Sequence, residues 1–191
     1  MNKKILIVEG YLASGKSTFA LRLSQKLKVP YLIKDTFKTA LCKSVTIADR
    51  QESSRFSGIT FDAMMYVAER MLEAGYPLVI EGNFVPAGIK KTDESEIIRQ
   101  LIKRYAYRSL DFKFVGDTRV LHQRFIEREK TPERGQANVI GEEVPLGVFD
   151  TWCHNLDGFH VGGRSVRVDT TDFNHVDFQG LLETAHQFMN E

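Results

Sequence analysis

The sequence predicts an α/β protein in which helices cover both faces of a parallel β-sheet. Short, strongly apolar segments alternate with amphipathic helical patterns along the whole chain, an order typical of β–α–β units. The chain has 191 residues, which is about one domain, and no repeat, low-complexity tract or Pro/Ser-rich linker divides it. We therefore expect residues 1–191 to form one domain around one parallel sheet.

Two strands and two helices are expected in the first half of the chain. The segment 4–8 is apolar after its first lysine, which indicates a buried strand, and 30–33 forms a second short strand. Between them, 16–28 carries apolar residues at helical spacing. The longest helical pattern covers 60–74, and Gly75 follows it as a helix end.

Three further strands are expected at 77–80, 110–115 and 165–168. Asp93 and Glu96 form a capping box that opens a helix through residue 102. Asp117 can cap the next helix, and the chain closes with an amphipathic helix over 175–189. Residues 130–145 are rich in Gly, Pro and Glu without apolar periodicity, which predicts a mobile loop.

The composition excludes several classes of protein. Hydrophobic residues make up 42% and charged residues 27%, which is typical of a globular chain and not of a disordered or fibrous one. A net charge of +1 gives little support for binding along a nucleic-acid backbone. Cys42 and Cys153 form no CxxC pair, and the apolar run Ile5–Val8 is too short for a signal peptide. We therefore expect a cytoplasmic protein.

The segment Gly10–Ser17 carries the motif that decides the functional interpretation. Its sequence, GYLASGKS, matches G-x-x-x-x-G-K-[ST] and lies between a predicted strand and a predicted helix, as a phosphate-binding loop requires. The glycines allow a tight loop whose backbone N–H groups face phosphate oxygens, and the following helix adds its N-terminal dipole. In such a loop Lys16 neutralises the outer phosphates and the Ser17 hydroxyl is a ligand of Mg²⁺.

Acidic residues stand at or just past the end of four predicted strands. They are Asp35, Glu81, Asp117 and Asp169. Because a nucleotide site on a parallel sheet lies at the carboxyl ends of the strands, these residues are the next candidates. Acidic residues also cap helices at such points, and Asp117 is interpreted as an N-cap.

Together these motifs resemble those of the small P-loop kinases of the nucleotide-kinase-like group, which includes gluconate and shikimate kinases, chloramphenicol phosphotransferase and zeta-type toxins. The resemblance covers nearly the whole chain through dispersed motifs: Gly10–Thr18, Asp35, Val79–Asn83, Arg124 with Arg128, and Asp169–Thr171. It implies a three-layer αβα P-loop NTPase fold, a five-stranded parallel sheet in the order 2-3-1-4-5, and a lid over about residues 128–147. It also implies Mg²⁺-assisted transfer of the ATP γ-phosphate to a hydroxyl group.

The resemblance assigns roles to two of the acidic residues. Asp35 matches a carboxylate that receives or orients the acceptor hydroxyl, and the alternative is a helix cap for residues 36–42. Glu81 matches an acidic residue that holds Mg²⁺ through water or binds substrate, although aspartate is more usual there. The metal ligands expected are therefore Ser17 and Glu81.

Two arginines, Arg124 and Arg128, lie four residues apart on one helical face. By resemblance they are lid arginines that reach the transferring phosphates, and the alternative is a solvated charge cluster with neighbouring glutamates. Arg134 is a candidate for a further clamp. The catalytic residues expected are Lys16, Asp35, Arg124 and Arg128.

The expected ATP-binding residues come from the phosphate loop and from the last strand. By resemblance Thr170 lies beside the adenine, where backbone contacts dominate. The full set is Gly10, Ala13, Ser14, Gly15, Lys16, Ser17, Thr18 and Thr170. Ala13 stands where many relatives have a glycine, and its small size should keep the loop geometry.

The sequence favours an ATP- and Mg²⁺-dependent kinase that phosphorylates a hydroxyl group of a small molecule. One alternative is a nucleotide-binding regulator with little or no transfer, and another is a kinase of nucleic-acid 5′-hydroxyls or of a sugar nucleotide. No N-K-x-D signature of a switch GTPase occurs, and Glu81-Gly82 replaces the Asp-Glu of a motor ATPase. The acceptor pocket is expected from the segments after the second and third strands, including Arg55, Phe61, Tyr66, Asn83 and Phe84.

Overall fold

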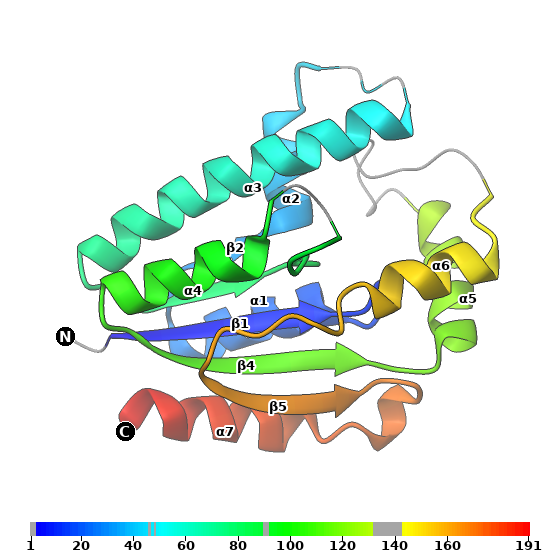
Figure 1. The fold of residues 1–191 in the computed structure, drawn as a ribbon. Helices are drawn as coiled ribbons and strands as arrows, with labels where there is room; N and C mark the ends of the chain where they lie inside the picture. The colour runs from blue at the N-terminus through cyan, green and yellow to red at the C-terminus, as the bar shows by residue number, and fades with distance from the viewer. Residues whose placement is uncertain (1–2, 46, 48, 90–91, 132–142) are drawn as a thin grey trace.

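The sheet of this protein consists of parallel strands. The computed structural model describes residues 3–45, 47, 49–89, 92–131 and 143–191. In this part of the chain the strands are β1 (Lys4–Gly10), β2 (Tyr31–Ile33), β3 (Leu78–Glu81), β4 (Arg108–Val115) and β5 (Arg164–Asp169). Their order across the sheet is β2-β3-β1-β4-β5 (Figure 1). The α/β class and the strand order 2-3-1-4-5 are confirmed.

Helices cover both faces of the sheet. They are α1 (Lys16–Leu27), α2 (Lys34–Leu41), α3 (Arg50–Glu73), α4 (Glu94–Arg104), α5 (Thr118–Glu129), α6 (Leu146–His154) and α7 (Phe178–Asn190), with a short 3-10 turn η3 (Phe173–His175). The helices α1 and α7 pack on one face, and α3 and α4 pack on the other (Figure 1).

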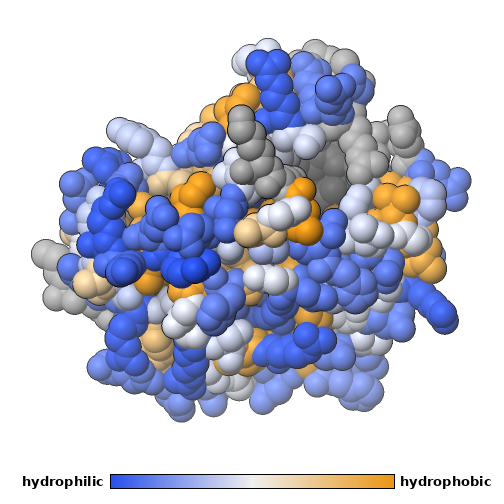
Figure 2. All heavy atoms as spheres, viewed as in Figure 1, coloured by the Kyte–Doolittle hydropathy of each residue, from blue (hydrophilic) through white to orange (hydrophobic). Residues whose placement is uncertain are grey.

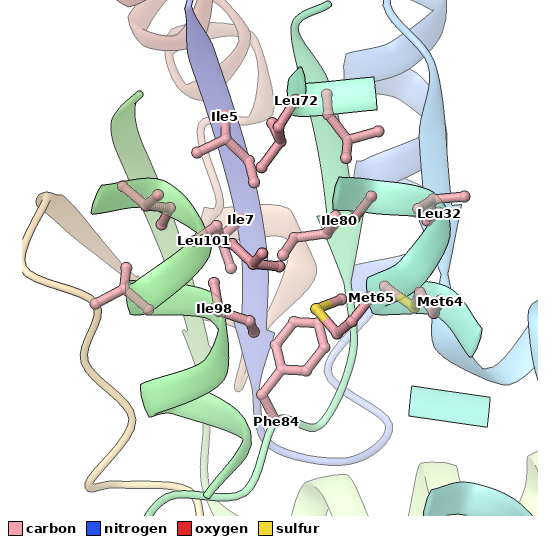
Figure 3. Close-up of a cluster of buried hydrophobic side chains, with 14 of the residues drawn as sticks. Ile5, Ile7, Leu32, Met64, Met65, Leu72, Ile80, Phe84, Ile98 and Leu101 are labelled. Carbon is pink, nitrogen blue, oxygen red and sulfur yellow. The ribbon is translucent and has the colours of Figure 1, made fainter. Parts of the chain in front are cut away.

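The strand β1 runs through the centre of the core, and this position explains the unbroken apolar run Ile5–Val8 in its sequence. Ile5 and Ile7 point toward α3 and α4, where they pack with residues such as Met64 and Leu101 (Figure 3). Leu6 lies in the cluster on the opposite face, with residues of α1 and α7. Because successive side chains of a strand alternate between faces, a sheet covered on both sides requires apolar residues at every position.

The predicted helix ends are confirmed where a local motif defines them. The Asp93 carboxylate accepts a hydrogen bond from the Glu96 N–H at 2.9 Å, and Asp117 accepts one from the Arg119 N–H at 2.8 Å. Gly75 follows the C-cap of α3 with φ at 82°, a left-handed conformation that glycine adopts without strain.

Two elements differ from the sequence prediction. The helix α3 begins at Arg50 instead of residue 60, because its first turns are mostly exposed or half-buried and so lack the apolar stripe that marks the rest. Asp49 caps this start by accepting the Glu52 N–H at 2.8 Å. The patterns also do not predict α6, whose nine residues follow the expected loop.

Residues 132–142, with Arg134 and most of the expected lid, lie outside the described part of the chain.

The surface seen in Figure 2 is mostly hydrophilic, and its apolar side chains form small, separate groups. Some large apolar residues are exposed, among them Tyr66 and Ile59, and single exposed apolar side chains are normal on a protein surface. Across the described residues, none of the helices combines the length and the apolar character that crossing a membrane requires.

Two buried carboxyl groups, those of Glu9 and Asp111, come from the neighbouring strands β1 and β4. Glu9 is fully buried, and neither of its carboxylate oxygens has a hydrogen-bond partner among the described residues. Asp111 on β4 accepts a hydrogen bond from the Ser165 hydroxyl at 3.0 Å. Burial raises the pKa of Glu9 to about 9, with the nearby Asp111 charge acting in the same direction. Glu9 is therefore held as the neutral acid at pH 7.

Replacing Glu9 with Gln is expected to stabilise the protein at alkaline pH. A carboxyl whose pKa is raised by folding contributes stability at low pH, and that stability is lost as the pH rises from the unfolded value of 4.5 toward about 9. With these two values, the gain of E9Q over the wild type should be about 4 kcal/mol larger at pH 8 than at pH 5. Urea unfolding at both pH values measures this gain. The exposed Glu183→Gln serves as the control, and an equal effect of E9Q at both pH values would contradict the assignment.

Candidate active site

The phosphate loop connects β1 to α1 in a conformation that its glycines permit. Gly10 and Gly15 have φ values of 115° and 86°. A Cβ at Gly10 would collide with the main chain of Phe114 on β4, so no other residue fits there. Ala13 also has a positive φ, 56°, which a small side chain tolerates at a cost of about 1 kcal/mol. The Ser14 hydroxyl closes the loop by donating to the carbonyl of Tyr11 at 2.7 Å.

The side chain of Lys16 is buried beneath this loop. Its ammonium group donates to the Tyr11 carbonyl, and only 5% of the residue is exposed. Burial lowers the pKa of Lys16, whereas the charges of Glu81 and Asp35 raise it. The acidic neighbours therefore favour the cationic form of a lysine that burial alone would neutralise.

Two oxygen donors meet at the start of α1. The Ser17 hydroxyl donates to Glu81 Oε2 at 3.1 Å, although 64 residues separate them in sequence. Burial raises the pKa of Glu81 to about 7, Asp35 adds to the rise, and the charge of Lys16 opposes it. Divalent cations such as Mg²⁺ prefer hard oxygen ligands, so the hydroxyl and the buried carboxylate fit a magnesium ion.

A single cleft of about 650 Å³ brings most of the predicted residues together. Its walls come from the phosphate loop, α1, α2, the end of β3, α5 and the segment after β5. The predicted residues that line it are Ala13, Ser14, Gly15, Lys16, Ser17, Thr18, Asp35, Glu81, Arg124 and Arg128. Of the predicted set, Gly10 and Thr170 are not among its lining residues.

Asp35 faces the cleft from the first turn of α2. Its position is the second in that helix, whose N-cap is Ile33. The backbone geometry therefore does not match the alternative in which Asp35 is the cap of this helix. Its carboxylate lines the cleft, and its charge acts on Lys16.

The two arginines of α5 have different surroundings. The guanidinium of Arg124 donates to the carbonyls of Thr170 and Thr171, at 2.6 and 2.9 Å, and stacks 4.1 Å from the centre of the Phe173 ring. These main-chain contacts, and not a cluster with neighbouring glutamates, hold Arg124. Arg128 lines the cleft one turn later, and its positive charge lowers the pKa of Glu81.

The last segment contributes residues that the sequence motifs missed. Thr170 is buried, its hydroxyl donates to the carbonyl of Val115 at 2.9 Å, and its own carbonyl accepts a hydrogen bond from Arg124. Phe173 lines the cleft and is 39% exposed. An aromatic residue shortly after the Asp-Thr-Thr segment is the sequence signal that could have identified it.

Only some of the residues expected to form the acceptor pocket line the cleft. Asn83 lines the cleft, directly after β3. Phe61 and Phe84 are instead fully buried in the core, where they flank the ammonium group of Lys34 at 5.1 and 5.8 Å. Lys34 is paired with Glu94 at 2.6 Å. These aromatic residues therefore stabilise a buried ion pair and do not belong to the described cleft.

Comparison with known proteins gives one matching family model and several solved structures that share this fold. Residues 5–156 match a family model described as an AAA domain. A candidate kinase of Chloroflexus aurantiacus has a TM-score of 0.85 at 22% identity, with 98% of this chain and 99% of that chain covered. A gluconokinase of Sinorhizobium meliloti has a TM-score of 0.55 at 15% identity, with 99% and 93% covered.

A third similar structure is a shikimate kinase of Bacteroides thetaiotaomicron, with a TM-score of 0.51 at 13% identity and 96% and 94% of the two chains covered. A comparison with curated proteins gives no match. At these identities, the likeness to solved structures shows a shared fold.

Proposed function

Because the chain belongs to the P-loop family described as an AAA domain, and such a loop binds nucleotides, we propose that it is an ATP-dependent phosphotransferase. The reaction proposed is transfer of the ATP γ-phosphate to a hydroxyl group of a small molecule. The observation that carries the proposal is the convergence of a phosphate loop, a carboxylate on α2 and an arginine on α5 on one cleft. A cleft of this size can hold a nucleotide.

The nucleotide would lie along the phosphate loop. Backbone N–H groups of Ala13–Thr18 and the N-terminus of α1 would bind the phosphates, and Lys16 would neutralise the outer ones. The base would lie near Phe173 and Arg124, whose planar groups form one wall of the cleft. Arg124 is thus proposed to act at the base end more than at the transferred phosphate.

The metal ligands proposed are Ser17 and Glu81. When bound, Mg²⁺ supplies positive charge that offsets the negative charge of the phosphate oxygens. The buried Glu81 would contribute as the carboxylate, a form that a nearby divalent cation favours over the acid. The hydrogen bond from Ser17 orients it before any metal is present.

The transfer itself depends on positioning. Asp35 would accept the hydrogen of the attacking hydroxyl and aim its oxygen at the γ-phosphate, since phosphoryl transfer needs an oriented nucleophile more than a strong base. Arg128 would stabilise the charge on the transferred group. Asn83, the neighbouring polar residue after β3, would hold the rest of the acceptor.

A transfer assay tests the proposal. The purified chain is incubated with ATP, Mg²⁺ and a panel of sugars, sugar acids, aminoglycosides and nucleosides, with a 5′-hydroxyl oligonucleotide as a separate arm. We expect ADP together with one compound made heavier by one phosphate, and no product when a chelator removes the metal. Calorimetric binding of ATP without transfer to any compound would favour the nucleotide-binding regulator, and product from the oligonucleotide would favour the nucleic-acid kinase.

A further inference from the structure

A cluster of polar side chains lies behind the phosphate loop, and the proposed chemistry does not use it. The hydroxyl of Tyr11 donates to Asp157 Oδ1 at 2.9 Å and lies 3.0 Å from His154 Nδ1. The same ring nitrogen lies 2.9 Å from Asp157 Oδ2, and His154 Nε2 lies 3.5 Å from Asp150 Oδ1. None of these four described residues is among those that line the cleft. We refer to them as the Tyr11 cluster.

Tyr11 is the second residue of the phosphate loop, and its main chain holds the loop at three points. Its N–H donates to the carbonyl of Phe114 at 2.8 Å. Its carbonyl accepts both the Ser14 hydroxyl and the Lys16 ammonium group. A rotation of Tyr11 would therefore move the lysine that faces the phosphates.

The side chain of Tyr11 is held by α6 and by Asp157, which follows that helix. Its ring is 5% exposed and packs in the apolar cluster that contains Phe149 and Cys153 of α6. The imidazole of His154 meets the ring edge to face, with the ring centres 5.5 Å apart. The phenol hydroxyl is thus anchored at the C-terminal end of α6, more than 140 residues away in sequence.

We propose that Tyr11 and His154 are positioning residues for nucleotide binding: the hydrogen bonds of the phenol fix Tyr11, and through its carbonyl they fix Lys16 and Ser14 in the orientation that receives phosphates. The inference rests on the proposed function only through nucleotide binding and not through transfer. Neither residue touches the nucleotide. Their effect passes through the main chain of the loop.

The protonation of His154 contributes to this anchor. The hydrogen bond with Asp157 raises the pKa of His154, burial opposes the rise, and Asp150 adds to it. Below that pKa the imidazolium pairs with both carboxylates, and as the pH rises through it the pairing with Asp150 is lost. Two further charged groups face the cluster: Lys113 of β4, which donates to the Asp157 carbonyl at 2.6 Å, and Arg167 of β5. Glu9 of β1 also lies near Asp157 and is a titratable group, neutral at pH 7. On α5, the neutral Thr118 donates to Asp150 at 2.6 Å.

A pair of tyrosine variants tests the anchor. Tyr11→Phe removes only the phenol oxygen. Tyr107→Phe is the matched control, because the single hydrogen of the Tyr107 hydroxyl is shared between two carbonyls that are not in the cleft, those of Leu72 and Tyr76. Calorimetry with ATP and Mg²⁺ gives the dissociation constant, and thermal unfolding checks the fold. We expect Y11F to weaken ATP binding about five- to tenfold. We expect Y107F to lower the melting temperature by about as much as Y11F does, but to leave ATP binding unchanged. Unchanged ATP binding by folded Y11F would overturn the proposal.

A histidine variant tests the role of the proton without disturbing the core. His154 is about half exposed, so His154→Gln is expected to fold. The dissociation constant for ATP is measured for the variant and the wild type at each pH. The ratio of the two constants is used because the titration of ATP affects both proteins equally. We expect a ratio of about three at pH 6 and near one at pH 8.5, whereas a ratio of one at both values would overturn the role of His154. If ATP binding follows these results but no hydroxyl compound is phosphorylated, the proposed function fails and this inference stands.

Discussion

Replacing Lys16 with alanine is expected to abolish phosphate transfer, with turnover reduced at least about 100-fold. Lys16 is the buried cation of the phosphate loop, and the nearby charges of Glu81 and Asp35 favour its cationic form. Without it, the outer phosphates lose their nearest fixed positive charge, and the carboxylates of the site repel the nucleotide. The loss should therefore appear in turnover and in ATP affinity together.

A control on the same helix separates this effect from a general loss of charge. Lys26 is exposed on α1, so Lys26→Ala should leave turnover within twofold. Steady-state kinetics and calorimetry on both variants, with thermal unfolding to confirm the fold, give the comparison. Substantial residual turnover in folded K16A would remove the proposed mechanism.

Replacing Asp35 with asparagine is expected to lower turnover about 10²- to 10⁴-fold while ATP affinity stays nearly unchanged. The amide keeps the size of the side chain at the start of α2, but it has no negative charge and cannot take up the proton of the acceptor hydroxyl. Because Asp35 is proposed to act on the acceptor and not on the nucleotide, the change should reach the transfer step and leave the phosphate loop intact.

The exposed Asp62 on α3 provides the matched control, and Asp62→Asn should leave both quantities unchanged. The kinetic constants for the acceptor found in the transfer assay, together with calorimetry for ATP, measure the split. If ATP affinity falls in D35N while the fold is intact, Asp35 is a structural or metal-linked residue and the acceptor role is wrong.

The parts of the site that the sequence predicted are those set by neighbouring residues. The phosphate loop is a contiguous segment, and its glycines, its lysine and the helix that follows fix its conformation locally. The caps formed by Asp93 and Asp117 were predictable for the same reason. The start of α3 at Arg50 was not, because a helix without an apolar stripe leaves no periodic signal.

The family resemblance located the further site residues but not their partners. Arg124 was expected at the phosphates, and only the packing of α5 against the segment after β5 shows its contacts with Thr171 and Phe173. Those groups lie nearly fifty residues apart in sequence. A spacing of four residues between two arginines indicates a shared helical face, and it contains no information on what that face meets.

By itself, the sequence determined that this chain folds as alternating strands and helices and carries a phosphate-binding loop, because hydrophobic periodicity and glycine conformation are local properties. Only the tertiary structure decided that Ser17 meets Glu81, and that Tyr11 is anchored by His154 and Asp157. These contacts depend on which strands become neighbours and where the loops return. That outcome is a property of the packed sheet as a whole, and no single segment encodes it.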